Sequence, residues 1–340
     1  MAGARATPAP ALRIGVITTS YPRHDGDAAG SFVVAHVRAL RELGHDVDVI
    51  AAGAQTTDGV QRVPGALFYG GGAPDALERL GLRALPEAAA FTARLTAAVA
   101  RRSRARSWDA AIAHWLAPSA IAAVAALPRR VPLLAIGHGG DVHTLRRAGL
   151  LAPVLHALRA RGAKLAVVSE ELRVLCAPTM AAVVQPMGID VPHFAAIGRA
   201  PTIPPTVAFI GRSVPVKGVD VLFAAMPRVE RATRLSIASE RTFAERDQLL
   251  REASVIVIPS RVLPNGRSEG TPLVALEALA AGVPVVASAV GGLVDLPVTL
   301  VPPEDPGALA AAIERVLAAP PPRVDMSAYD WRTVVHKLTP

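Results

Sequence analysis

The stretch E-G-T-P-L-V-A-L-E at residues 269–277 is the most informative segment of this chain, because two carboxylates bracket an otherwise apolar segment. We expect a helix to begin near Thr271, since Thr can cap a helix and Pro272 suits a first helical turn. Glu269 then lies beside the free N–H groups of the helix start, where anions bind. Glu277 lies about two turns into the helix. The pattern predicts an anion site at a loop-to-helix junction.

Two further segments follow this stretch. A-A-G-V-P-V-V-A-S at residues 280–288 predicts a helix end and a buried strand, and V-G-G at residues 290–292 predicts a second tight turn. Together the three segments resemble the donor-site signature of retaining GT-B glycosyltransferases, specifically glycosyltransferase family 4. The resemblance implies an α/β fold of two Rossmann-like, doubly wound parallel-sheet domains that face a cleft.

Composition agrees with two globular domains. The chain has 340 residues, of which 51% are hydrophobic and 19% charged. No stretch reaches the apolar length of a membrane helix, and residues 1–11 are expected to be a loose N-terminus rather than a signal peptide. Cys176 is the only cysteine, so no internal disulfide can form and a cytoplasmic, reducing location is expected.

The chain opens with a predicted strand at 13–18, a helix at 31–43 and a strand at 46–51, an order that indicates a parallel sheet. The first strand lacks the G-x-G-x-x-G that follows it in nicotinamide-dependent oxidoreductases, which argues against that class. By resemblance, Gly30 lets the loop before the helix approach the donor closely.

Asp46-Val47-Asp48 has the Asp-x-Asp form of a metal-binding signature found in another glycosyltransferase fold. Here it opens a strand directly after the helix-ending Gly44. We therefore expect a solvent-facing strand start and no metal site.

Another predicted strand, at 132–136, runs into G-H-G-G-D at residues 137–141. His138 therefore lies at the carboxyl end of a parallel strand, where α/β folds place ligands. The family has a similar His-Gly-x-Asp loop, and the resemblance implies that His138 faces the transferred sugar. Asp141 is expected to cap the next helix.

The second domain is predicted to open with a strand at 207–210, followed by Gly211-Arg212 and Lys217-Gly218. This order resembles the family's phosphate-contacting turn. Arginine supplies a planar fork of donors and lysine a point charge, and both suit a diphosphate.

We predict four regions: the loose N-terminus 1–11, an acceptor-side domain 12–196, a donor domain 197–320 and a tail 321–340. The donor domain is shortened relative to the family pattern, since only residues 239–253 separate two of its predicted strands. This segment normally helps to hold the nucleotide base. A degenerate, non-catalytic GT-B partner subunit is therefore the alternative interpretation.

The resemblance implies transfer of a hexosyl group, with retention, from a nucleotide-diphosphate sugar to a hydroxyl acceptor in glycan, polysaccharide or glycolipid synthesis. No cofactor and no metal are expected. The catalytic residues would be His138, Arg212, Lys217 and Glu269. The donor-binding residues would be Gly30, Gly211, Gly270, Thr271, Pro272, Leu273 and Glu277, with Glu269 on sugar hydroxyls and Glu277 on the ribose.

Charge is unevenly distributed along the chain. Residues 1–200 contain 22 Lys and Arg against 14 Asp and Glu, whereas residues 201–340 contain 14 of each. Nucleic-acid binding is not expected, because aromatic interleaving and a known binding module are absent. The basic half predicts either scattered solvated arginines or a peripheral contact with an anionic membrane that carries a lipid-linked acceptor. The most compact basic cluster is Arg101, Arg102, Arg104 and Arg106.

Overall fold

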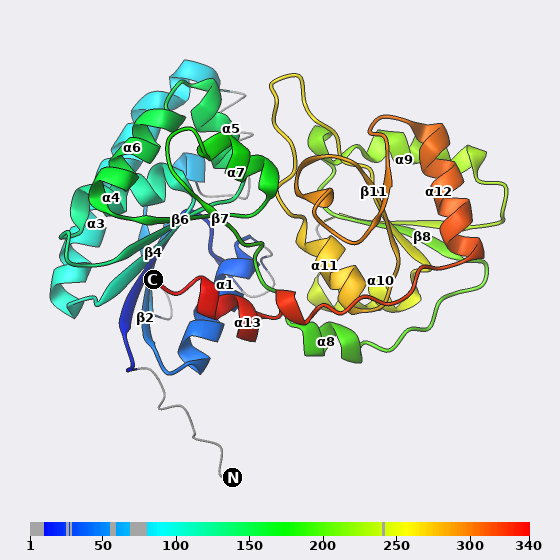
Figure 1. Ribbon diagram of the computed structural model, residues 1–340, viewed down its shortest axis with the longest axis horizontal. Coiled ribbons are helices and arrows are strands. Elements are labelled where there is room, and N and C mark those ends of the chain that lie inside the picture. Colours follow the sequence, from blue (N-terminus) through cyan, green and yellow to red (C-terminus); the bar gives the residue numbers. More distant parts are fainter. Residues whose placement is uncertain (1–9, 25–26, 28, 55–58, 69–79, 240–241) are drawn as a thin grey trace, which may run out of the picture.

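The computed structural model describes residues 10–24, 27, 29–54, 59–68, 80–239 and 242–340. It consists of two parallel β-sheets, each in its own lobe and each covered by helices (Figure 1). The predicted α/β architecture of two doubly wound domains is confirmed.

The first sheet contains seven strands in the described part of the chain, and every paired neighbour is parallel. These strands are β1 (Arg13–Thr18), β2 (Asp46–Ala52), β3 (Val60–Val63), β4 (Ala110–His114), β5 (Leu133–Gly137), β6 (Lys164–Val167) and β7 (Val183–Val184). Their order is β3-β2-β1-β4-β5-β6-β7, so the winding direction reverses between β1 and β4. Ligands of doubly wound folds bind at the carboxyl ends of the strands beside such a switch point.

The second sheet has the order β12-β11-β10-β8-β9, with its switch point between β8 and β10. The five described strands are β8 (Thr206–Ile210), β9 (Arg234–Ala238), β10 (Val255–Ile258), β11 (Val285–Ser288) and β12 (Thr299–Val301). Separate hydrophobic clusters pack on this sheet, one built around α11 (Leu273–Ala280) and the other around α12 (Pro306–Ala318). The loops that follow β8 and β10 therefore meet at the carboxyl ends of two neighbouring strands in the second sheet.

Of the described helices, α1 matches the predicted helix at 31–43 to within one residue. Those of the first domain are α1 (Ser31–Glu42), α3 (Leu85–Arg106), α4 (Ile121–Ala126), α5 (Gly140–Arg147), α6 (Leu151–Arg161) and α7 (Glu170–Cys176). The remaining helices are α8 (Val191–Ala196), α9 (Val219–Ala225), α10 (Phe243–Glu252) and α13 (Trp331–Lys337). In segment 239–253, which is predicted to be short, the described residues contain one helix, α10, whose start is fixed by a capping box between Thr242 and Glu245.

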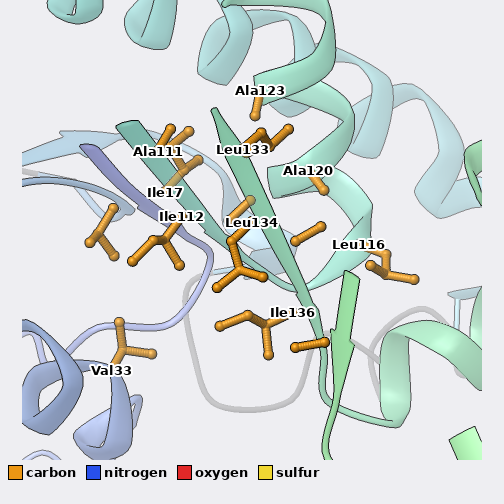
Figure 2. Close-up of a cluster of buried hydrophobic side chains, with 14 of the residues drawn as sticks. Ile17, Val33, Ala111, Ile112, Leu116, Ala120, Ala123, Leu133, Leu134 and Ile136 are labelled. Atoms are coloured by element: carbon orange, nitrogen blue, oxygen red, sulfur yellow. The ribbon is translucent and has the colours of Figure 1, made fainter. Parts of the chain in front are cut away.

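The first core forms because the central strands are apolar on both faces, as parallel strands covered by helices must be. Ile17, Ile112 and Ile136 come from three neighbouring strands, and their side chains are almost fully buried (Figure 2). Val33 of α1 packs into the same cluster.

The chain crosses between the domains twice. Ile189 and Phe194, which belong to the predicted acceptor-side range, pack in the second core. In the predicted tail, α13 returns to the first lobe, where Trp331 and Val334 join the first core (Figure 1). A parallel bridge between Ile189 and Asp330 joins the two crossing segments.

Candidate active site

The turn after β8 and the loop after β10 lie against each other. A Cβ added at Gly218 would approach the carbonyl oxygen of Pro259, at the end of β10, to 2.0 Å. Gly218 also has a φ of +61°, a left-handed conformation that favours glycine. Glycine at this position therefore lets the turn that carries Lys217 pack directly on the strand leading to Glu269.

Lys217 and Glu269 form the central ion pair of the site. Lys217 Nζ lies 3.0 Å from Glu269 Oε1, and the two side chains are 18% and 13% exposed. The buried Oε1 has an ionic contact with the lysine, but no partner meets hydrogen-bond geometry. Lys217 therefore compensates the charge of the largely buried carboxylate. Arg212 lies on the same turn as Lys217 and is exposed.

The V-G-G turn fixes the backbone around Glu269. Gly291 has a φ of +53°, and a Cβ there would approach the carbonyl oxygen of Glu269 to 2.0 Å. The backbone N–H of Gly292 donates to the carbonyl oxygen of Gly270 at 2.9 Å. The predicted V-G-G turn is thus packed backbone to backbone against Glu269 and Gly270.

The start of α11 differs from the prediction. The helix begins at Leu273, with Pro272 as the residue before it, and no side chain caps it. Thr271 is not the cap, because its hydroxyl donates to the carbonyl oxygen of Val168 in the first domain. The hydroxyl therefore joins the two domains at the site instead of capping α11.

Further contacts across the domain boundary place His138 beside Gly270. A Cβ on Gly270 would lie 2.7 Å from the carbonyl oxygen of His138 and 2.9 Å from Val168 Cγ2. The Ser268 hydroxyl donates to Glu171 Oε2 at 2.8 Å. Because these partners belong to different domains, the site is assembled from both.

The prediction that Asp141 caps a helix is wrong. Asp141 lies within the first turn of α5, and its buried side chain anchors the preceding loop. Its carboxylate accepts the backbone N–H groups of Leu116 at 2.6 Å, His138 at 3.0 Å and Gly139 at 3.1 Å. Burial raises the pKa of Asp141, although these hydrogen bonds favour its ionised form. The carboxylate holds the His138 loop against the end of β4.

Two histidines that sequence reasoning missed accompany His138. His114 Nδ1 lies 3.1 Å from His138 Nε2, and His36 Nδ1 lies 3.2 Å from His114 Nε2. Burial lowers the pKa of His138 to about 3, and the nearby His36 ring further disfavours protonation, so the ring is neutral at physiological pH. The position of His114 at the carboxyl end of a strand beside β5 is the signal that could have identified it.

Glu277 forms an ion pair with an arginine of α10, in segment 239–253. Arg246 Nη1 of α10 lies 3.0 Å from Glu277 Oε1, and the Arg246 guanidinium also contacts Asp247 and the ring of Phe194. Burial raises the pKa of Glu277, and Arg246 opposes this shift. No local pattern indicated that α10 would supply this arginine.

The two predicted loop glycines have different surroundings. Gly30 has a φ of +70°, and a Cβ there would approach the Ser20 carbonyl oxygen to 2.3 Å, so packing within its own loop requires glycine. Its approach to a donor stays a prediction. Gly211 donates its N–H to the carbonyl oxygen of Ala238 at 2.9 Å, which ties the end of β8 to β9.

The Asp-x-Asp segment is engaged by arginines. Asp48 is buried and accepts hydrogen bonds from Trp108 Nε1 at 2.8 Å and Arg102 at 2.6 Å. Burial would raise the pKa of Asp48, but these bonds lower it below its ordinary value. Asp46 is exposed and pairs with Arg106 at 2.6 Å. A solvent-facing strand start is therefore right for Asp46 and wrong for Asp48, whose partners come from distant parts of the chain.

Within the described ranges, no group of three or more His, Cys, Asp or Glu side chains could hold a metal ion. Over the same residues, no helix is both long and apolar enough to cross a membrane.

Solved structures define the fold. The sucrose-phosphate synthase of Thermosynechococcus elongatus has a TM-score of 0.69 at 20% identity, with 96% of this chain and 92% of that chain covered. The Anabaena protein HepE, solved in complex with UDP-glucose, has a TM-score of 0.61 at 14% identity, with coverages of 96% and 98%. The two lobes therefore form a GT-B fold.

Sequence comparisons show the family. The profile described as Glycosyltransferase Family 4 matches residues 29–191, and that described as Glycosyl transferases group 1 matches residues 204–319. The glycogen synthase of Mycobacterium tuberculosis is 30% identical over an alignment of 286 residues, and the match covers 67% of this chain and 67% of that protein. The D-inositol 3-phosphate glycosyltransferase of Segniliparus rotundus is 35% identical over 119 residues, 26% of this chain and 25% of that protein. The chain belongs to the family 4, or group 1, glycosyltransferases.

Proposed function

We propose that this glycosyltransferase moves a hexosyl group from a nucleotide-diphosphate sugar to a hydroxyl acceptor with retention of configuration. The observation that carries the proposal is the Lys217–Glu269 pair, in which a cation and a largely buried carboxylate meet beside the His138 loop. Among proteins of similar fold, HepE was solved with UDP-glucose, and a starch synthase from Arabidopsis thaliana was solved with ADP and acarbose. UDP-glucose and ADP both contain the diphosphate that the cationic Lys217 suits.

The proposed chemistry is electrostatic. The leaving diphosphate gains negative charge as the sugar bond breaks, and fixed cationic donors stabilise that charge without solvent reorganisation. Lys217 and the exposed Arg212 would serve this role, and Glu269 would hold sugar hydroxyls. Glu277 would contact the ribose with its oxygen that Arg246 leaves free. His138 would face the transferred sugar.

A thermal-shift screen tests donor binding. UDP-glucose, ADP-glucose and other nucleotide sugars are compared with their free sugars, because a ligand of the native state raises the melting temperature by mass action. Since the site offers cationic side chains to the diphosphate, we propose a metal-independent reaction, and the shift and transfer should survive EDTA. Loss of both in EDTA, with recovery in magnesium or manganese, would contradict metal independence.

Turnover and stereochemistry need a second measurement. The donor selected by the screen is incubated with hydroxyl acceptors, and NMR of the product reports the anomeric configuration, which should match that of the donor. Binding without transfer to any acceptor would favour the alternative of a non-catalytic GT-B partner subunit. The contact of Glu277 with Arg246 gives that alternative a structural basis, because one carboxylate oxygen is already occupied.

We also propose that the basic first domain contacts an anionic membrane surface when the acceptor is lipid-linked. Arg102 and Arg106 are paired with Asp48 and Asp46, so the exposed Arg101 and Arg104 are the better candidates within the predicted cluster. Each basic residue near an anionic leaflet contributes about 1 kcal/mol.

The double variant Arg101→Ala/Arg104→Ala should reduce co-sedimentation with phosphatidylserine vesicles about 10-fold or more at low salt. The matched control is Arg228→Ala/Arg251→Ala, which removes two exposed arginines from the second domain. Equal loss in both double variants would indicate nonspecific charge attraction. Absence of wild-type binding at low salt would leave an acceptor that is not in the membrane.

A further inference from the structure

Three histidines form a continuous chain that leads from the first core to the site. His36 comes from α1, His114 ends β4 and His138 follows β5. Because β4 and β5 are parallel neighbours in register, their carboxyl ends place His114 and His138 side by side, with ring centroids 5.2 Å apart and nearly parallel. The two N···N distances in the chain, 3.2 and 3.1 Å, are hydrogen-bond distances.

Aromatic rings enclose the chain. Trp331 of α13 stacks on His36, with centroids 5.1 Å apart and an interplanar angle of 15°. At the other end Phe32 and Trp115 lie 5.0 and 4.8 Å from the His138 ring. His36 and His114 are fully buried, whereas His138 is only partly buried. The chain therefore has one sealed end and one end at the site.

The sealed end fixes the direction of the hydrogen bonds. A neutral histidine carries one N–H, so each N···N contact needs the proton on one side only. If the chain donated toward His36, the Nε2 of His36 would carry a buried N–H without a partner. Among the residues that the structure describes, that atom has no hydrogen-bond partner. A buried orphan N–H is rarer in proteins than an under-satisfied acceptor, so the bare nitrogen is the favoured state.

We propose that His36 and His114 are positioning residues that hold His138 as the neutral tautomer with its proton on Nδ1. His36 Nδ1–H donates to His114 Nε2, and His114 Nδ1–H donates to His138 Nε2. His138 Nδ1–H is then a fixed donor, and it suits an oxygen acceptor such as a sugar hydroxyl. The tautomer follows from the contacts alone, whereas its use on a sugar rests on the proposed function.

The test is nitrogen NMR of the ligand-free protein labelled with ¹⁵N-histidine, because protonated and bare ring nitrogens have well-separated shifts. His138→Gln identifies the His138 signals by their loss. In the wild-type protein, Nδ1 of His138 should be protonated and Nε2 bare. A wild-type His138 with its proton on Nε2, or with both nitrogens protonated at neutral pH, would overturn the proposal.

Two substitutions of His114 separate positioning from packing. His114→Phe removes the donor but keeps an aromatic ring, and it should move the tautomer ratio of His138 about 5-fold or more toward Nε2–H. His114→Asn keeps an N–H near the position of Nδ1 and should retain the wild-type tautomer. An unchanged tautomer in a His114→Phe protein that still melts cooperatively would reject the role of His114.

The leucine variant of His36 extends the test to the sealed end. His36→Leu removes the first donor, so the His138 tautomer ratio should shift in the same direction as in His114→Phe. Addition of UDP-glucose to the wild-type protein then reports on the sugar. A perturbed Nδ1 signal would support contact between His138 and the donor. No perturbation, with the tautomer as expected, would count against the proposed function and leave the positioning intact.

Discussion

Lys217→Ala is expected to lower the rate of sugar transfer by about 10²–10³-fold, the usual effect of removing one preorganised donor from a developing anion. Lys217 is the partly buried cation of the site, and its turn is fixed on β10 through Gly218. Arg212→Ala should lower the rate in the same range. Both residues lie on the turn at the domain boundary, so the overall fold should survive.

Steady-state transfer assays with the donor found by thermal shift provide the measurement. Lys164→Ala, which removes an exposed lysine at the start of β6, is the matched control and should keep wild-type turnover. Because Lys217→Ala also leaves Glu269 without its cation, Lys217→Ala/Glu269→Gln should recover melting temperature but not activity. Wild-type turnover in Lys217→Ala and Arg212→Ala would remove both residues from the mechanism.

Gly291→Ala should abolish the thermal response to nucleotide sugars and lower transfer at least 100-fold, since a displacement of about 1 Å at a reacting centre can cost that much. The added Cβ would approach the carbonyl oxygen of Glu269 to 2.0 Å, and that contact involves backbone, which cannot rotate away. The carboxylate of Glu269 should therefore move away from Lys217.

Gly266→Ala is the matched control for this substitution. Gly266 has a φ of +76° in the same domain, but a Cβ there would meet no atom within 4 Å. Both variants carry the left-handed penalty of about 1–2 kcal/mol, so both should melt at a lower temperature. Only Gly291→Ala should lose the ligand response. An equal loss in both variants would assign the effect to backbone strain.

The sequence was informative where function depends on local order along the chain. Lys217 follows the predicted strand at 207–210, and the family resemblance assigned Lys217 and Glu269 to the same donor site, where the structure pairs them. The tight turn at Gly291 was also visible, because a Gly-Gly pair after an apolar strand marks a turn.

The features that the sequence did not reveal are contacts between segments far apart in the chain. Thr271 has the chemistry of a helix cap, but a carbonyl of the other domain competes for its hydroxyl. The burial of Asp48 depends on Arg102 and Trp108, and the partner of Glu277 comes from α10. Such pairings depend on the tertiary arrangement, and the hydrophobic periodicity of the sequence does not predict them.

The return of α13 to the first lobe also determines the order in which the protein can be completed during translation. Domains usually fold from the N-terminus onward as the ribosome releases them. Here the first core needs Trp331, Val334, Val335 and Leu338, which are synthesised after every strand of the second domain. One face of α1 in the N-terminal lobe therefore stays uncovered until the second domain and α13 have been synthesised. The N-terminal lobe is therefore synthesised first, but its core is completed last.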